Sequence, residues 1–461
     1  MYDLLKGLRV VEGSAFVAGP TCGLHLAQMG AEVIRFDNIG GGPDFRRWPL
    51  AENGASLYWE GLNKAKKSVA LDLTRPEGRE IAQALATAPG DRAGLFVTNF
   101  PVDGFLSYET LSRRRRDLIC VRVMGWANGA QGMDYTINAA LGLPLMTGPA
   151  DDPRPVNHVL AAWDLLTGAY CAFSLTAALI ARERDGEGRE IRAPLSDIAG
   201  ATMANLGMTA ETALAGRQRP RMGNDVFGAF GRDFATKDGK TLMVLAITPR
   251  QWSKALEVLG LAAEVAALEA ELGVSFAVDE GLRFTHRARL YPLFERAFAG
   301  RTAAELAAAL EAGGVTWGAY QPLEAALEGE LGVSFATDEG LRFTHRARLY
   351  PLFERAFAGR TAAELTPAFD AGGVTWGAYQ PLEAALTDRR LYQDNPLFEA
   401  IRHPSGLTYP APGAMGTIPQ DERQPVAPAA RLGQHTDEVL AEVLGMGSVE
   451  IARLHDQGLV A

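Results

Sequence analysis

The chain has 461 residues, of which 47% are hydrophobic and 22% charged, as is typical of a globular protein with more than one domain. Acidic residues outnumber Lys and Arg by 55 to 45, and the net charge of −10 argues against a nucleic-acid-binding protein. Three cysteines without metal-ligand spacing indicate a reducing compartment and no metal site (Cys22, Cys120 and Cys171). The chain starts in a strand pattern, and no charge-free apolar run reaches membrane-spanning length, so we expect a cytoplasmic protein without membrane contact.

Short apolar strands alternate with helices through the first half of the chain. We predict strands at Leu8–Val11, Glu32–Phe36, Gly94–Thr98 and Leu118–Val123, and helices at Pro20–Met29 and Gly78–Ala86. Strands and helices that alternate at this spacing predict an α/β fold with a parallel, doubly wound sheet covered on both faces. Ligands of such sheets bind beyond the carboxyl ends of the strands.

Three loops that follow these strands are candidate ligand-binding loops: Val17–Pro20, Asn38–Pro43 and Asn99–Pro101. The glycines of the second loop follow the second strand and do not open a helix, so they are interpreted as a turn and not as a dinucleotide fingerprint. Arg46 and Arg47, which come next, only slightly favour an anionic ligand. The basic stretch at 63–68 is compatible with either a solvated turn or a phosphate-facing edge.

One apolar stretch, Pro155–Glu183, predicts a long helix with a single acid, Asp164, near its start. Five of its apolar positions predict burial against the sheet: Leu165, Ala169, Phe173, Leu175 and Leu179. A carboxylate at the start of a buried helix is either a helix cap or a chemical group, and spacing alone favours the cap.

A second, smaller domain is expected where the alternation fades after Gly200. Two predicted strands, Ala229–Asp238 and Lys240–Ile247, form a hairpin, and helices follow from Arg250. We expect a large domain at 1–200, a linker at 201–224, a small α+β domain at 225–395 and a return segment at 396–461. The return segment is predicted to contain a long loop at Pro404–Pro428 and helices at Thr436–Leu444 and Ser448–Gln457.

The small domain contains a tandem repeat. Residues 266–324 recur at 325–383 with about 53 of 59 positions identical, and each copy predicts two helices, a strand and a further helix. Two copies are too few for a solenoid, so a recent duplication or an artefact of sequence assembly is favoured over a new function. We hypothesise that one copy takes the ordinary place in the domain and the other packs outside it, away from the chemistry.

Several stretches, taken together and in order, resemble the family III CoA transferases, which include formyl-CoA and carnitine CoA transferases. The resemblance is carried by Leu5–Asp37, Asn63–Arg79, Asn99–Phe100, Ala162–Gly168 and Arg431–Leu440. It implies a Rossmann-like large domain completed by the C-terminal tail, a small domain between its parts, and an interlocked homodimer. Coenzyme A would be bound as a substrate thioester, with no permanently bound cofactor, and Asp164 falls on the catalytic aspartate of the family motif.

The resemblance also implies contacts with CoA. We expect them at Val17, Ala18, Leu71, Asp72, Leu73, Thr74, Asn99, Phe100, Pro101 and Tyr135. Two positions depart from the family pattern, because Asn38 and the stretch Gly104–Ser107 stand where family members often have CoA-contacting arginines. Four polar residues are plausible contacts to the acyl group or, equally, polar residues with local partners: Tyr135, Asn138, Asn157 and His158.

Within the family, the stretches at 10–20, 40–49 and 134–149 most resemble an enzyme that moves CoA between the 1- and 4-carboxyl groups of the C5 diacid mesaconate. This implies that Asp164 attacks the thioester to give a mixed anhydride and then an aspartyl-CoA thioester, with oxyanion donors near Gly19–Pro20 and with Trp163 and Leu165 excluding water. The alternatives are an intermolecular transferase with a succinyl-CoA donor, a racemase and a non-catalytic CoA-binding protein. Racemisation is disfavoured because Met133 replaces the family racemases' histidine.

Overall fold

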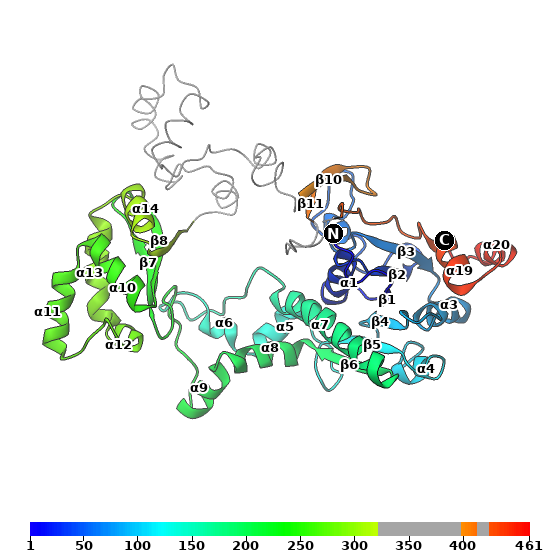
Figure 1. Cartoon of the computed structure of the whole chain (residues 1–461), viewed down its shortest axis with the longest axis horizontal. Helices are drawn as coiled ribbons and strands as arrows, with labels where there is room; N and C mark the ends of the chain where they lie inside the picture. The colour runs from blue at the N-terminus through cyan, green and yellow to red at the C-terminus, as the bar shows by residue number, and fades with distance from the viewer. Residues whose placement is uncertain (321–397, 413–423) are drawn as a thin grey trace, which may run out of the picture. The chain divides into compact units, whose positions relative to one another are not determined.

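The computed structural model describes residues 1–320, 398–412 and 424–461 (Figure 1). The chain divides into two compact units, each described separately below. The large unit consists of Met1–Leu145, Pro155–Arg219 and Asn395–Ala461, and the small unit consists of Met146–Arg154 and Pro220–Asp394. The return of the chain to the large unit after the small one is the organisation that the family resemblance implies.

A six-stranded parallel sheet forms the centre of the large unit, in the order β3-β2-β1-β4-β5-β6. Its strands are β1 (Arg9–Gly13), β2 (Glu32–Asn38), β3 (Lys66–Leu71), β4 (Leu95–Thr98), β5 (Ile119–Met124) and β6 (Arg189–Pro194). The four predicted strands and the parallel α/β class are therefore confirmed. Chain order reverses between β1 and β4, and this topological switch point is where doubly wound sheets bind ligands.

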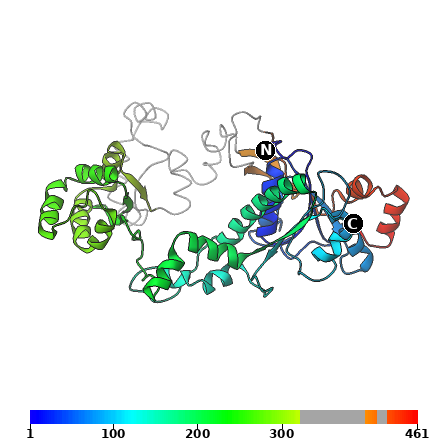
Figure 2. The same ribbon diagram turned by 60° about the horizontal axis from the view of Figure 1, so that its bottom comes forward.

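Helices cover both faces of this sheet and bury two separate cores. On one face lie α3 (Pro76–Ala86), α19 (Thr436–Leu444) and α20 (Ser448–Asp456), so the C-terminal segment completes this layer. On the other face lie α1 (Ala18–Gln28), α7 (Ala162–Asp185) and α8 (Leu195–Asn205). Helices α1 and α7 lie side by side (Figures 1 and 2).

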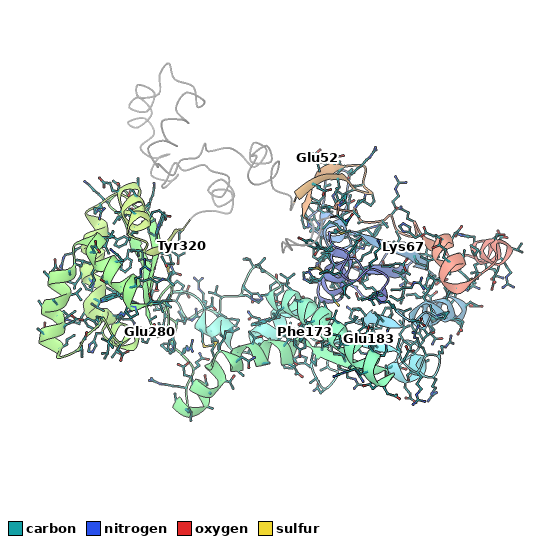
Figure 3. All side chains as sticks on the ribbon, in the orientation of Figure 1. Glu52, Lys67, Phe173, Glu183, Glu280 and Tyr320 are labelled. Atoms are coloured by element: carbon teal, nitrogen blue, oxygen red, sulfur yellow. The ribbon has the colours of Figure 1, made fainter. Side chains whose placement is uncertain are left out.

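The long helix α7 differs from its prediction in two ways. It begins at Ala162, seven residues after the predicted start. Leu175 and Leu179 are buried as expected, but Leu165, Ala169 and Phe173 are exposed, because only one face of α7 packs on α1 and β5 (Figure 3). Among the described residues, α7 is the one helix whose length and composition would allow a membrane span, a test that core helices also pass.

Two segments predicted to be irregular form strands instead. The stretch 63–68 is neither a solvated turn nor a phosphate-facing edge, because its second half enters β3 and buries Lys66 against Glu12. The Pro404–Pro428 loop contains β11 (Thr408–Pro412), which pairs with β10 (Phe398–Arg402).

Further elements of the large unit that the sequence pattern did not indicate are α2 (Leu57–Leu62), α4 (Tyr108–Ser112), α5 (Asp134–Ala140) and α6 (Leu143–Met146). The expected linker 201–224 contains α9 (Met208–Ala215).

The small unit contains an antiparallel sheet packed against helices. Its strands are β7 (Phe230–Ala235), β8 (Thr241–Ala246) and β9 (Thr316–Ala319), and β7 and β8 form the predicted hairpin. Its helices are α10 (Pro249–Leu259), α11 (Ala262–Leu272), α12 (Glu280–Thr285), α13 (Arg287–Ala299) and α14 (Ala303–Ala312). The first repeat copy supplies much of this core and has more helices than predicted, whereas the second copy lies outside the described residues.

Candidate active site

The loops after β1 and β4 meet at the switch point of the sheet. Asn99, directly after β4, holds both backbone groups of Ala15: its Oδ1 accepts from the Ala15 N–H (3.1 Å) and its Nδ2 donates to the Ala15 carbonyl (2.9 Å). Val17 and Ala18 follow at the start of α1. The structure therefore brings together two of the three predicted CoA-binding loops, and the amide of Asn99 serves to join them.

Polar side chains fix the predicted CoA contacts that follow β3 and β4. Arg122 is fully buried and donates to the carbonyls of Phe100 (2.8 Å) and Pro101 (2.9 Å). After β3 ends at Leu71, the Leu73 N–H donates to Oδ1 of Asn38 (3.2 Å). A further turn forms where the Asp72 carboxylate accepts from the N–H (3.0 Å) and hydroxyl (2.5 Å) of Thr74. Asn38, which replaces a family arginine, thus has a structural role at the same sheet edge.

Asp164 is the third residue of α7, and another carboxylate caps this helix. Oδ2 of Asp134, from α5, accepts from the N–H groups of Trp163 (2.6 Å) and Asp164 (3.1 Å). These N–H groups belong to the first turn, where a helix has no internal acceptors. The cap interpretation of Asp164 is therefore wrong, because Asp134 performs that role and leaves the Asp164 carboxylate available.

The electrostatic setting of Asp164 is unusual for an aspartate. Its pKa is raised from 3.8 to about 7; burial is the largest cause, the Asp134 carboxylate adds to it, and the Arg47 guanidinium opposes both. The Asp164 side chain forms no hydrogen bond or ion pair with the described residues. A carboxyl group that is poised near neutral pH and has no structural partner is a candidate chemical group.

A polar network surrounds the start of α7. His158 Nε2 lies 2.6 Å from Asp134 Oδ1, and the Trp163 indole N–H donates to Asn138 Oδ1 (3.1 Å). Asn138 in turn donates to Asn157 Oδ1 (2.5 Å). The Tyr135 hydroxyl donates to the Val159 carbonyl (3.2 Å). Each of the four predicted acyl contacts therefore has a protein partner, and His158 contacts the capping carboxylate directly.

Close packing between α7 and α1 places Asp164 near the start of α1. A Cβ at Gly168, one turn after Asp164, would lie 2.6 Å from Thr21 Cβ and 2.7 Å from the Ala18 carbonyl oxygen. The first N–H groups of a helix lack internal acceptors, and in α1 these belong to Ala18 and Gly19, because Pro20 has none. They are the candidate donors to an oxyanion that forms at Asp164.

A buried ionic network lies beneath the β1 loop. Lys66 pairs with Glu12 (2.8 Å), and Arg35 pairs with Asp37 (2.7 Å) and Asp44 (3.2 Å). Asp44 also accepts from the N–H of Phe16 (3.0 Å), which has a positive φ of 71°. Buried charges need such partners, and here the network holds the β1 loop in its conformation.

Three residues near Asp164 were missed as members of the site: Phe16, Tyr58 and the capping Asp134. Arg47 was considered only as a weak indicator of an anionic ligand. The charges of Arg47 and Asp134 both act on Asp164, and the charge of Asp164 acts on Tyr58. No spacing in the sequence connects these positions, which come from separate loops and helices. Among the described residues, no group of three or more His, Cys, Asp or Glu could hold a metal ion.

The class of this protein is indicated by a parallel sheet with Asp164, an aspartate of raised pKa, at the edge where the carboxyl ends of the strands lie. The sequence matches the model of CoA-transferase family III at residues 5–331 and 329–436, so the chain belongs to this family and is an enzyme of the CoA-transferase class. Solved structures agree on the fold. A CAIB/BAIF family protein from Brucella suis has a TM-score of 0.64 at 22% identity and covers 96% of this chain and 100% of its own.

Curated relatives name more specific activities. The 2-methylfumaryl-CoA isomerase of Chloroflexus aurantiacus is 42% identical over 463 aligned residues, which cover 100% of this chain and 98% of the relative. The succinyl-CoA–D-citramalate CoA-transferase of the same organism is 30% identical over 56% of this chain and 65% of the relative. The succinate–glutarate CoA-transferase of Agrobacterium fabrum is 34% identical over 48% of this chain and 57% of the relative.

Proposed function

We propose that this enzyme isomerises 2-methylfumaryl-CoA to 3-methylfumaryl-CoA, moving CoA between the 1- and 4-carboxyl groups of mesaconate. The observation that carries the proposal is the poised Asp164 at the switch point of a family III sheet. The full-length similarity to a 2-methylfumaryl-CoA isomerase supports the choice of substrate. Coenzyme A enters and leaves as part of the thioester, and no permanent cofactor takes part.

The reaction follows from the chemistry of a carboxylate nucleophile. The ionised Asp164 attacks the thioester carbon, the C–S bond breaks, and a mixed anhydride and a CoA thiolate result. The thiolate then attacks the aspartyl carbonyl, which releases the diacid as a carboxylate and leaves an aspartyl-CoA thioester. The second carboxylate of the same diacid attacks this thioester, and the steps run in reverse. Each tetrahedral intermediate carries an oxyanion that the N–H groups of Ala18 and Gly19 would stabilise.

Retention of the diacid separates this function from intermolecular transfer. With both carboxylates on one bound molecule, the second attack benefits from proximity and needs no second acid. Intermolecular transfer from succinyl-CoA is the second candidate, because partial matches to two succinyl-CoA and succinate transferases favour it.

Isotope-labelled free mesaconate, added during turnover of 2-methylfumaryl-CoA, distinguishes the two functions. Label should stay out of the product CoA ester when product is analysed by mass spectrometry before appreciable equilibration. Succinyl-CoA should give no mesaconyl product at a comparable rate. Incorporation of label at the turnover rate would contradict intramolecular transfer and support the second candidate.

We also propose that the enzyme acts as a homodimer. One face of α7 exposes four large apolar side chains at helical spacing: Leu166, Tyr170, Phe173 and Ile180. Phe173 is 65% exposed and lies on the outer face of the helix (Figure 3). A continuous apolar stripe of this kind is typical of an interface. A second copy of the chain would bury it, as the family resemblance implies.

A further inference from the structure

Arg47 lies in the segment between β2 and α2, and two aromatic rings orient its guanidinium. The guanidinium carbon lies 5.7 Å from the centroid of the Phe16 ring and 5.5 Å from that of Tyr58. Among the described residues, Arg47 forms no ion pair with a carboxylate. Aromatic faces restrict a guanidinium without occupying its N–H donors, so Arg47 presents an oriented, uncompensated cation near Asp164.

Tyr58 contributes a second polar group beside Arg47. Its hydroxyl oxygen is buried and makes no hydrogen bond of good geometry within the part of the chain that the structure describes, although the Arg47 guanidinium lies close enough to lower its pKa. Leaving a buried polar group unpaired costs about 1–3 kcal/mol, a cost that a ligand group bound to this hydroxyl would remove. The pKa of Tyr58 is raised to about 12, with burial as the main cause; Arg47 lowers it, and the Asp44 and Asp164 carboxylates raise it. The hydroxyl therefore stays protonated as a donor at neutral pH.

Local hydrogen bonds hold Arg47 and Tyr58 in place before any ligand binds. Ser56 Oγ donates to the Arg47 carbonyl (2.5 Å) and accepts from the Trp59 N–H (3.1 Å), so one side chain fixes the backbone of Arg47 and the start of α2, which carries Tyr58. The Arg47 N–H donates to the Asp44 carbonyl (3.2 Å), and the Asp44 side chain holds Phe16. Preorganised donors of this kind bind a ligand at a lower entropic cost.

We propose that Arg47 and Tyr58 bind the free carboxylate of the dicarboxylic acyl group while Asp164 engages the thioester carbon. This inference rests on the proposed function, because only a dicarboxylic substrate has a second carboxylate to hold. A guanidinium fork binds a carboxylate through two parallel hydrogen bonds, and the tyrosine hydroxyl adds a third. Once CoA has been transferred to Asp164, the released diacid has a carboxylate at each end. The same pair can therefore hold either end, which lets the diacid reverse its orientation without leaving.

Arg47→Leu and Arg47→Lys test the anchor, with Arg46→Leu as the matched control that removes an equal charge one residue away. We expect Arg47→Leu to lower kcat/KM for 2-methylfumaryl-CoA on the order of 100-fold or more, because an unpaired carboxylate is left in the site. Arg47→Lys should recover part of this loss. Inhibition by free CoA should not change. An Arg47→Leu loss no larger than that of Arg46→Leu would overturn the proposal.

Binding of the free acids separates this inference from the proposed function. Calorimetry on the wild-type enzyme should show mesaconate binding more tightly than the monocarboxylate crotonate, and Arg47→Leu should remove the difference. If the wild type binds mesaconate in this way but does not isomerise its CoA ester, the proposed function fails and the anchor stands. Equal binding of the two acids by the wild type would overturn the anchor.

Tyr58→Phe separates binding from structure. Removal of an unpaired buried hydroxyl should leave the melting temperature unchanged or higher, whereas mesaconate affinity should fall roughly 10-fold, as expected for one lost hydrogen bond. A merely structural tyrosine would show the opposite pattern, with lower stability and unchanged affinity, and that outcome would overturn the assignment of Tyr58.

Discussion

At the scale of single residues, two carboxylates at the start of α7 have different roles. Asp134 accepts from the N–H groups of Trp163 and Asp164 and from His158, so its charge is fully engaged. Asp164 has no such partner and is raised in pKa by burial and by Asp134. Neighbouring carboxyl groups that have different environments and different roles are a recurrent arrangement in active sites. Here Asp134 supports the helix start, and Asp164 is left available for chemistry.

The pH dependence of activity follows from the raised pKa of Asp164. The nucleophile is the ionised form, so kcat/KM should rise as pH increases through about 7 and level off above it. A kcat/KM profile from about pH 5 to about pH 9 measures this, and a profile that falls across this interval would exclude an ionised Asp164 as the nucleophile.

Stability should show the opposite trend with pH. The folded protein holds a proton on Asp164 between its ordinary pKa of 3.8 and about 7, so the wild type loses stability as pH rises through this window. Asp164→Asn carries no such charge. At about pH 8 the variant should exceed the wild type by on the order of 1–3 kcal/mol, allowing for partial solvent screening. Denaturant unfolding at two pH values tests this; equal pH dependence in both proteins would contradict it.

At the scale of elements, α7 carries two separate features. Its start carries Asp164, Gly168 allows the close approach to α1, and its outer face carries the apolar stripe. An 18-residue stretch of α7 is apolar enough to cross a membrane, yet only 39% of it is buried. This mismatch between composition and burial is what a second copy of the chain would resolve.

Phe173→Asp should weaken the homodimer, because a charge in an apolar interface must be desolvated without a partner. Sedimentation analysis should show more monomer than in the wild type at the same concentration. Val449→Asp is the control, since Val449 is 83% exposed on α20 and stands outside the stripe. An unchanged mass for Phe173→Asp, or an equal change in the control, would contradict the assignment of the interface.

The elements show which features a single sequence can predict. The strand predicted at Glu32–Phe36 was recoverable because Val33, Ile34 and Phe36 form a short apolar run. β3 was missed because Lys66 and Ser68 are polar, and the Glu12 that compensates Lys66 comes from a strand 54 residues away. Likewise, the start of α7 depends on Asp134, a cap from another helix. Asp164 was found through its motif, whereas the proximity of Arg47 and Tyr58 depends on the tertiary fold alone.

At the scale of the whole molecule, the chain contains two nearly identical repeat copies, of which the described residues include most of the first. The first copy supplies α12, α13 and α14, whose apolar side chains pack with β7 and β8. The family model matches the chain in two parts, which overlap at 329–331, near the start of the second copy. The described residues of the candidate site belong to the large unit, whereas both copies belong to the small unit; that the extra copy lies away from the chemistry stays a hypothesis.

Deletion of residues 325–383 should therefore leave a folded enzyme with kcat/KM within a few-fold of the full-length chain. Each copy carries nearly the same residues, so the joined sequence retains one complete unit. Circular dichroism establishes folding before activity is compared. A deletion variant that folds but has lost isomerase activity would contradict the hypothesis and assign a function to the second copy.

The most direct test of the central claim is to identify the residue that becomes bound to CoA. The enzyme is incubated with 2-methylfumaryl-CoA, quenched, digested and analysed by mass spectrometry, with Asp164→Asn treated in parallel. The account predicts a CoA thioester on the peptide that contains Asp164, sensitive to hydroxylamine, and no adduct or turnover in Asp164→Asn. An adduct on another residue, or full turnover by Asp164→Asn, would contradict it.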